Sequence, residues 1–151
     1  MDFIITGLPR SRTFWMATYL GWSHDPLYRI DSIDDLKNEN FVDTVVGRYY
    51  NLFSKIYPSA KWIVILRDPQ EVRKSLKAKM PKLDLSLPLS FLDMDYRLLK
   101  QIPASLTIPF HKYNESGEQL HKVLNLPFNK EKWKWQCEMN VQVPDLQLMV
   151  N

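Results

Sequence analysis

The chain has 151 residues, of which 45% are hydrophobic and 25% are charged, and its formal net charge is +3. A chain of this length can bury one sizeable core, so we expect a single domain over residues 1–151. The composition excludes a disordered chain, and the small positive charge does not favour a protein that coats nucleic acid.

The cysteine content and the hydropathy pattern bear on the cellular compartment. The single cysteine, Cys137, excludes an internal disulfide and favours a reducing compartment. No apolar run approaches the roughly 20 residues that a helix needs to cross a bilayer. The first residues show neither a basic leader nor a small-residue cleavage site. We therefore expect a cytoplasmic protein that does not bind membranes.

Two short segments have the pattern of central strands. Residues 2–6 (DFIIT) and 61–66 (KWIVIL) are rich in β-branched residues and apolar on both faces. This is typical of a parallel sheet that helices cover on each side. Between them, residues 40–57 carry Phe41, Val45, Tyr49 and Phe53 at helical spacing. The sequence therefore predicts a βαβ unit.

The rest of the chain continues this alternation. We predict further helices over residues 13–20, 69–79, 88–101, 115–124 and 130–137, a third strand over 105–110 and a short strand near 27–30. The fold class is then α/β, a three-layer α/β/α sandwich whose central sheet is mainly parallel, as in P-loop nucleotide hydrolases. For the final stretch, NVQVPDLQLMVN, an edge strand, a packing tail and an oligomer contact remain alternatives.

The loop after the first strand reads GLPRSRT. In open parallel sheets, ligands bind beyond the carboxyl ends of the strands. Gly7 would allow a tight turn, and a helix that begins near Ser11 to Thr13 would direct unpaired backbone N–H groups into the loop. Arg10 and Arg12 add permanent positive charge. The sequence predicts a phosphate or sulfate site, with two alternatives: surface charge for the arginines, and helix capping for the hydroxyls.

This loop does not match the ATP-binding motif G-x-x-x-x-G-K-[ST]. Arg12 and Thr13 stand where the Gly-Lys pair would fall. The loop alone therefore gives little support to an ATP site.

The segment RDPQEVRKSL follows the second predicted strand. Asp68 fits a helix N-cap, and Glu71 three residues later completes a capping-box pattern. Arg67 is then fixed at the carboxyl end of a central strand, and Ser75 lies on the helix face shared with Glu71. Arg67 and Ser75 could close on one phosphate. The alternative is that Arg67 pairs with Asp68 or Glu71 and that Ser75 only packs.

Together, the two segments resemble the sulfotransferase family. The family's 5'-phosphosulfate loop reads Pro-Lys/Arg-Ser-Gly-Thr-Thr-Trp, and the matching residues here are Pro9, Arg10, Ser11, Thr13 and Trp15. The family's 3'-phosphate element has an arginine at a strand end and a serine eight positions later, matched by Arg67 and Ser75. A weaker third similarity joins HKYNES, residues 111–116, to the family's Tyr-Glu-Asp-Leu segment.

The resemblance implies the cofactor 3'-phosphoadenosine 5'-phosphosulfate (PAPS) and in-line transfer of its sulfuryl group to a hydroxyl or amine acceptor. Arg10 would contact the phosphosulfate and its bridging oxygen, where preorganised donors contribute most to catalysis. Ser11 and Thr13 would hold the 5'-phosphate. Arg67 and Ser75 would select the 3'-phosphate. The transfer needs no metal.

The resemblance also implies a base that takes the proton of the acceptor. The segment WSHDPLY brings His24 and Asp25 to the expected neighbourhood. Asp25 precedes a proline, so we expect an extended backbone that projects its side chain into the cleft. Asp25 is the preferred base, with His24 as substitute or orienting group. The alternative is a turn-forming aspartate and an exposed histidine.

The sequence departs from the family pattern at several points. Arg12 replaces the glycine and Phe14 the second threonine, so both belong to the predicted cofactor loop. The carboxyl-terminal basic segment has no counterpart, and Arg73 and Lys74 are candidate substitutes. The short chain leaves room for a bulky acceptor, or for a homodimer in which a second subunit completes the site.

Three other functions remain open. One is a P-loop phosphotransferase that uses ATP and magnesium, with Asp68 near the metal. The second is a non-catalytic nucleotide-binding protein of sulfotransferase ancestry. The third, a nucleic-acid face, is disfavoured by the modest net charge and would use the basic residues Arg67, Arg73, Lys74, Lys77, Lys79 and Lys82.

Overall fold

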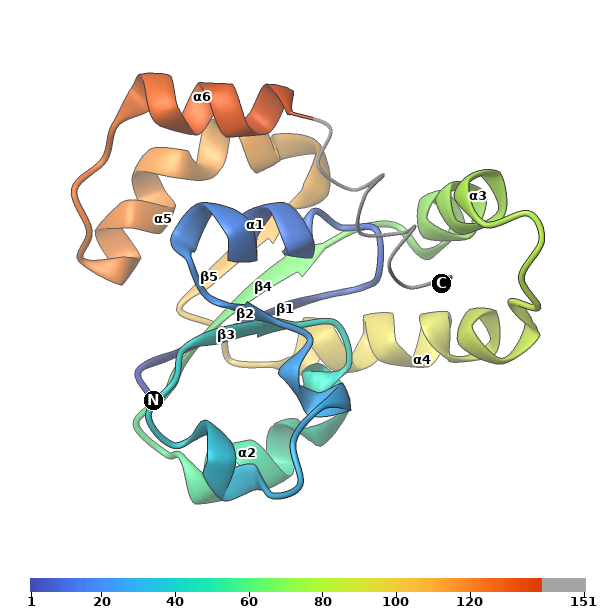
Figure 1. Ribbon diagram of the computed structural model, residues 1–151, viewed down its shortest axis with the longest axis horizontal. Helices are drawn as coiled ribbons and strands as arrows, with labels where there is room; N and C mark the ends of the chain where they lie inside the picture. Colours follow the sequence, from blue (N-terminus) through green and yellow to red (C-terminus); the bar gives the residue numbers. More distant parts are fainter. Residues whose placement is uncertain (140–151) are drawn as a thin grey trace.

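A parallel sheet of five strands lies at the centre of the computed structural model, which describes residues 1–139 (Figure 1). The strands are β1 (Phe3–Gly7), β2 (Ser23–His24), β3 (Phe41–Asp43), β4 (Lys61–Leu66) and β5 (Leu106–Pro109). Their order in the sheet is β2-β3-β1-β4-β5, and each neighbouring pair is parallel.

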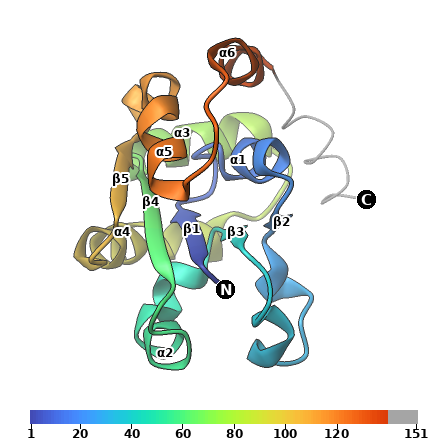
Figure 2. The ribbon, with the colours of Figure 1, turned by 90° about the vertical axis from the view of Figure 1, so that its left-hand side faces the viewer.

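Helices cover both faces of this sheet. Figures 1 and 2 show α1, α5 and α6 on one face and α2 and α4 on the other. The α-helices are α1 (Thr13–Leu20), α2 (Tyr50–Ile56), α3 (Pro69–Lys79), α4 (Ser86–Gln101), α5 (Gly117–Leu124) and α6 (Lys130–Glu138). The 3₁₀ helices are η1 (Pro26–Tyr28), η2 (Ile33–Leu36), η3 (Val46–Tyr49) and η4 (Phe110–Ser116). The predicted three-layer α/β/α sandwich is confirmed.

The two central strands contribute side chains to two separate cores. Ile4 packs in one core with Val64, together with buried residues of α2 and α4. Ile5 packs in the other core with Ile63 and Ile65, together with buried residues of α1, α5 and α6. Successive residues of a strand point to opposite faces of the sheet, so an uninterrupted apolar strand requires a helical layer on each side.

Most predicted elements agree with the structure. The helices over 13–20 and 69–79 have the predicted bounds, and α6 extends the predicted helix by one residue. Helix α4 begins earlier than predicted, at Ser86, and α5 begins later, at Gly117, because η4 occupies the preceding residues. Asp68 caps α3, since its Oδ1 accepts a hydrogen bond of 2.7 Å from the backbone N–H of Gln70.

Two predicted elements are wrong. Residues 40–57 do not form one helix, because Phe41–Asp43 pair with β1 as strand β3, and the helical part begins only at η3. Residues 27–30 do not form a strand, because η1 covers Pro26–Tyr28 and the short strand β2 lies earlier, at Ser23–His24. The alternatives considered for residues 140–151 lie outside the described residues.

Gly7 has a different role from the predicted tight turn. It is the last residue of β1 and pairs with Ile65 of β4. A Cβ atom at Gly7 would lie 2.9 Å from the carbonyl oxygen of Ile65, which is too close for any side chain. The turn itself uses left-handed backbone at Arg10 and Arg12, each with φ of 63°. The glycine therefore allows the close approach of two strands.

The strand order places two loops side by side. Strand β1 lies between β3 and β4. After β1, the chain forms β2 and β3 on one side of it and then β4 on the other side. The loops that follow β1 and β4 therefore leave the sheet at adjacent positions on its carboxyl edge, where open α/β sheets bind ligands.

Among residues 1–139, no helix combines the length and the apolar character that crossing a membrane requires.

An ion pair between Arg48 and Asp95 joins η3 to α4 and is expected to stabilise the fold. Arg48 donates to both carboxylate oxygens of buried Asp95 at 2.8 Å. We expect Asp95→Asn to lower the free energy of unfolding by about 2 kcal/mol, because it weakens the charged hydrogen bonds from Arg48, whose side chain is partly exposed. Urea denaturation measures this loss. Asp93→Asn is the matched control, since Asp93 pairs with Arg73 at the surface, and equal losses in both variants would contradict the prediction.

Candidate active site

Hydrogen bonds connect the loop after β1 to the elements that follow β4. Arg67 donates from Nη1 to the backbone carbonyl oxygen of Arg10. Arg10 in turn donates from Nε to Ser75 Oγ of α3, over 3.1 Å. The structure thus brings together Arg10, Arg67 and Ser75, which are far apart in the sequence.

Arg67 lies in a partly buried position with two further contacts. Its guanidinium carbon stands 3.9 Å from the centre of the Phe110 ring, and its Nε lies 3.5 Å from Glu71 Oε2. Burial lowers the pKa of Arg67, the nearby Glu71 opposes this effect, and the charge of Arg12 adds to it. Glu71 turns to Arg67, as one of the alternatives foresaw, and the reciprocal half of the predicted capping box is not formed.

The Arg12 side chain points toward η4. Its Nη1 donates to Asn114 Oδ1 over 2.5 Å. Its guanidinium carbon stands 4.6 Å from the ring centre of Trp15, 5.1 Å from Tyr113 and 5.7 Å from Phe110. These contacts hold Arg12 against aromatic rings, so it links the loop to η4.

The hydroxyls of the loop do not cap α1. Arg12 occupies the N-cap position and makes no side-chain capping bond. Ser11 is fully buried, and its Oγ has no hydrogen-bond partner among residues 1–139. A buried hydroxyl without a partner is costly, and a ligand would satisfy it. Ser11 therefore does not cap α1, and its contact with a ligand stays a prediction.

Left-handed backbone at two arginines is the least common feature of the loop. Arg10 and Arg12 both have φ of 63°, a conformation that costs residues other than glycine roughly 1 to 2 kcal/mol. Such strain persists only where the surroundings impose it, and it is concentrated at functional sites.

His24 contacts the first residue of α1. Its Nε2 is hydrogen-bonded to Thr13 Oγ1 at 3.2 Å and lies 3.6 Å from Asp25 Oδ2. The ring of Phe14 meets the imidazole edge-on at 5.4 Å between centres. His24 therefore connects the start of α1 to the neighbouring carboxylate.

The predicted conformation of Asp25 is wrong. Its backbone is left-handed, with φ of 48° and ψ of 50°, rather than extended. Its Oδ1 accepts hydrogen bonds from the backbone N–H of Thr44, at 2.7 Å, and from Thr44 Oγ1, at 3.1 Å. These bonds hold the carboxylate against the loop after β3. Pro26, which follows Asp25, therefore does not determine where the Asp25 side chain points.

Asp43 is a buried carboxylate that the sequence did not indicate. It ends β3 and accepts backbone hydrogen bonds from Leu27, Val45 and Val46, over 2.8 to 3.2 Å. Burial and the charge of Asp25 raise its pKa to about 6, although the hydrogen bonds oppose this. The sequence predicts a helix over residues 40–57, and that prediction does not place Asp43 at the end of a strand.

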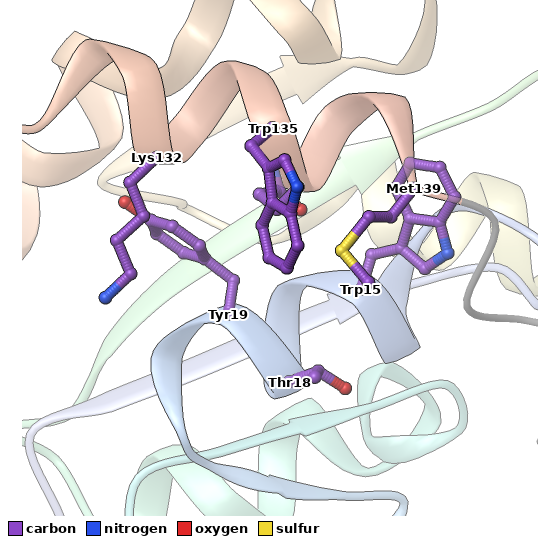
Figure 3. Close-up of a pocket in the computed structure, with 7 residues that line it drawn as sticks. Trp15, Thr18, Tyr19, Lys132, Trp135 and Met139 are labelled. Atoms are coloured by element: carbon purple, nitrogen blue, oxygen red, sulfur yellow. The ribbon is translucent and has the colours of Figure 1, made fainter.

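An aromatic pocket of about 280 Å³ lies between α1 and α6 (Figure 3). Trp15 and Tyr19 of α1 form one side, and Trp135 and Lys132 of α6 lie opposite. Trp15 also contacts Arg12, so this pocket adjoins the loop after β1.

A second groove, of about 400 Å³, lies on another side of α1, next to His24. Its lining residues are Phe14, Ala17, Thr18, Gly21, Trp22, Ser23, His24 and Arg29. It includes one permanent cation and no carboxylate, so it is suited to a polar ligand.

Two other expectations can be compared with the geometry. Arg73, a candidate for gripping the 3'-phosphate, donates to both carboxylate oxygens of Asp93, at 3.3 and 2.7 Å. Its guanidinium is therefore already paired. No group of three or more histidine, cysteine, aspartate or glutamate side chains in the described part of the chain is arranged to hold a metal ion.

Comparisons of the chain with protein-family models, with curated proteins and with solved structures returned no match.

The raised pKa of Asp43 predicts a pH dependence of stability. The folded state binds this proton more tightly than the unfolded chain, whose carboxylate has a pKa near 3.8. The contribution of Asp43 is therefore most favourable below about pH 4, and it is lost as the pH rises to about 6. We expect the free energy of unfolding, taken relative to Asp43→Asn, to fall by about 2 to 3 kcal/mol over this range. Urea denaturation at a series of pH values measures the difference, and a constant difference would contradict the assignment.

Proposed function

We propose that the protein is a sulfotransferase that binds PAPS where the β1–α1 and β4–α3 loops meet. The observation that carries the proposal is the chain of hydrogen bonds from Arg67 to Arg10 and from Arg10 to Ser75. It brings into contact the two segments that resemble the cofactor-binding elements of the family.

The charge distribution of the site supports an anionic ligand. Arg12 lies close enough to Arg67 for its charge to lower the Arg67 pKa. Among residues 1–139, the carboxylate paired with Arg67 is that of Glu71, whose side chain is 60% exposed to solvent. Solvent screening weakens such a pair, so it neutralises the site only in part. The α1 N-terminus and the Ser11 hydroxyl, which has no partner within the described residues 1–139, add hydrogen-bond donors for a phosphate.

Each part of the cofactor is assigned to residues of the site in this proposal. Ser11, Thr13 and the first N–H groups of α1 would bind the 5'-phosphate, and Arg67 with Ser75 would select the 3'-phosphate. Pro9 and Phe14 would shape the loop around it. The aromatic pocket beside Trp15 is suited to the adenine ring, because flat apolar walls favour a planar ligand.

The chemistry needs a base, and the geometry favours His24 over Asp25. His24 would accept the proton of the acceptor hydroxyl or amine while that oxygen or nitrogen forms a bond to sulfur. The bond between sulfur and the bridging oxygen breaks, and its electron pair leaves with the 5'-phosphate. Arg10 would stabilise the charge on that oxygen. Asp25, 3.6 Å away, would orient the imidazole.

The acceptor would enter through the polar groove that His24 lines. This groove lies beside Thr13, so an acceptor in it is next to the proposed position of the phosphosulfate.

Nucleotide binding tests the proposal. We expect 3'-phosphoadenosine 5'-phosphate (PAP) to bind without magnesium, and we expect Arg67→Ala to weaken it at least tenfold, because charged hydrogen bonds are lost. Calorimetric titration with PAP, and with ATP in the presence and absence of magnesium, measures both. Arg73→Ala is the matched control in α3 and should leave the affinity unchanged. A preference for magnesium-ATP would refute the proposal in favour of a phosphotransferase.

Turnover separates an enzyme from a non-catalytic nucleotide-binding protein. We expect His24→Gln to reduce transfer from PAPS by about 10² to 10⁴ and to leave PAP affinity unchanged, since a positioned base acts only on the chemical step. PAP release can be followed with a mixture of simple alcohols, phenols and amines as acceptors. Equal rates of PAP formation from PAPS in His24→Gln and in the wild-type protein would show that His24 is not the base.

A further inference from the structure

Phe110 lies between two of the arginines of the site. Its ring centre is 3.9 Å from the guanidinium carbon of Arg67 and 5.7 Å from that of Arg12. The position follows from the sheet, because β4 and β5 pair in parallel with Leu66 opposite Pro109. Arg67 follows β4 and Phe110 follows β5, so their side chains meet at the carboxyl edge of the sheet.

We propose that Phe110 is a positioning residue that sets the preference of the site for a nucleotide with a 3'-phosphate, because it fixes the orientation of the Arg67 guanidinium. This inference rests on the proposed function. Phe110 itself need not touch the nucleotide.

Three contacts restrain the Arg67 side chain. The Phe110 face confines the plane of the guanidinium, the Arg10 carbonyl accepts from Nη1, and Glu71 lies 3.5 Å from Nε. Within residues 1–139, Nη2 has no hydrogen-bond partner, so it remains available to an anion. A fixed guanidinium loses less conformational entropy when it binds a phosphate.

Glu71 competes with the 3'-phosphate for the guanidinium of Arg67, and the contact of Arg67 with Phe110 limits this competition. Its carboxylate is exposed and one helical turn from Arg67, and its 3.5 Å contact is longer than a well-formed charged hydrogen bond. Without the ring of Phe110, Arg67 is free to turn toward Glu71. That pair would neutralise the charge needed for the 3'-phosphate.

Arg12 holds Phe110 in its place from the other side. Its bond to Asn114 and its contacts with the Trp15 and Tyr113 rings tie η4, which begins with Phe110, to the loop after β1. Arg12, which replaces the glycine of the family loop, thus supports the position of Phe110.

The test compares PAP with AMP, which lacks the 3'-phosphate. Calorimetry on the full chain gives the ratio of the AMP dissociation constant to the PAP dissociation constant. We expect Phe110→Leu to reduce this ratio roughly tenfold and to leave AMP affinity within about twofold. Phe110→Tyr, which keeps the aromatic face, should keep the ratio. The double variant Phe110→Leu with Glu71→Gln should recover much of it, because the competing charge is gone.

The remaining outcomes are decisive as well. An unchanged ratio in Phe110→Leu, or an equal loss of AMP and PAP affinity, would overturn the inference while the proposed function stands. A wild-type protein without preference for PAP would overturn both. If circular dichroism shows that Phe110→Leu does not fold, Phe110→Met, which nearly conserves volume but removes the ring, takes its place with the same expected result.

Discussion

The candidate site depends on one hydrogen bond, from the Arg67 side chain to the Arg10 carbonyl oxygen. This bond joins the loop after β1 to the end of β4, so the two phosphate-binding elements proposed here act as one unit. The left-handed backbone at Arg10 presents its carbonyl to Arg67, while the Arg10 side chain reaches Ser75. One residue thus uses its main chain and its side chain to connect three segments.

Aromatic rings organise the charges around this bond. Phe110 faces Arg67, and Trp15 and Tyr113 face Arg12. Guanidinium groups stack well on aromatic faces, which lets cations lie close together with few carboxylates between them. The positions of the Arg12 and Arg67 guanidinium groups are therefore fixed by packing against these rings.

Hydrophobic pattern and helix signals predicted most of the fold and part of the site. The apolar strands and the Asp68-Pro69 helix start indicated where Arg67 lies, and β1 and α1 placed Arg10 in the adjacent loop. Phe41 was misassigned to a helix because its spacing from Val45 and Phe53 suits both elements, and only its pairing with β1 makes it a strand. The conformation of Asp25 depends on Thr44, and that of Arg12 on Asn114, partners that no local pattern could reveal.

Gly7 determines how far apart the two loops stand. With a hydrogen atom in place of a side chain, β1 meets β4 so closely that even a methyl group would contact the Ile65 carbonyl. A wider spacing of these strands would separate the loop that carries the Arg10 carbonyl from the end of β4, where Arg67 begins the next loop. The spacing of the two loops is thus set inside the sheet, three residues before the chain reaches Arg10.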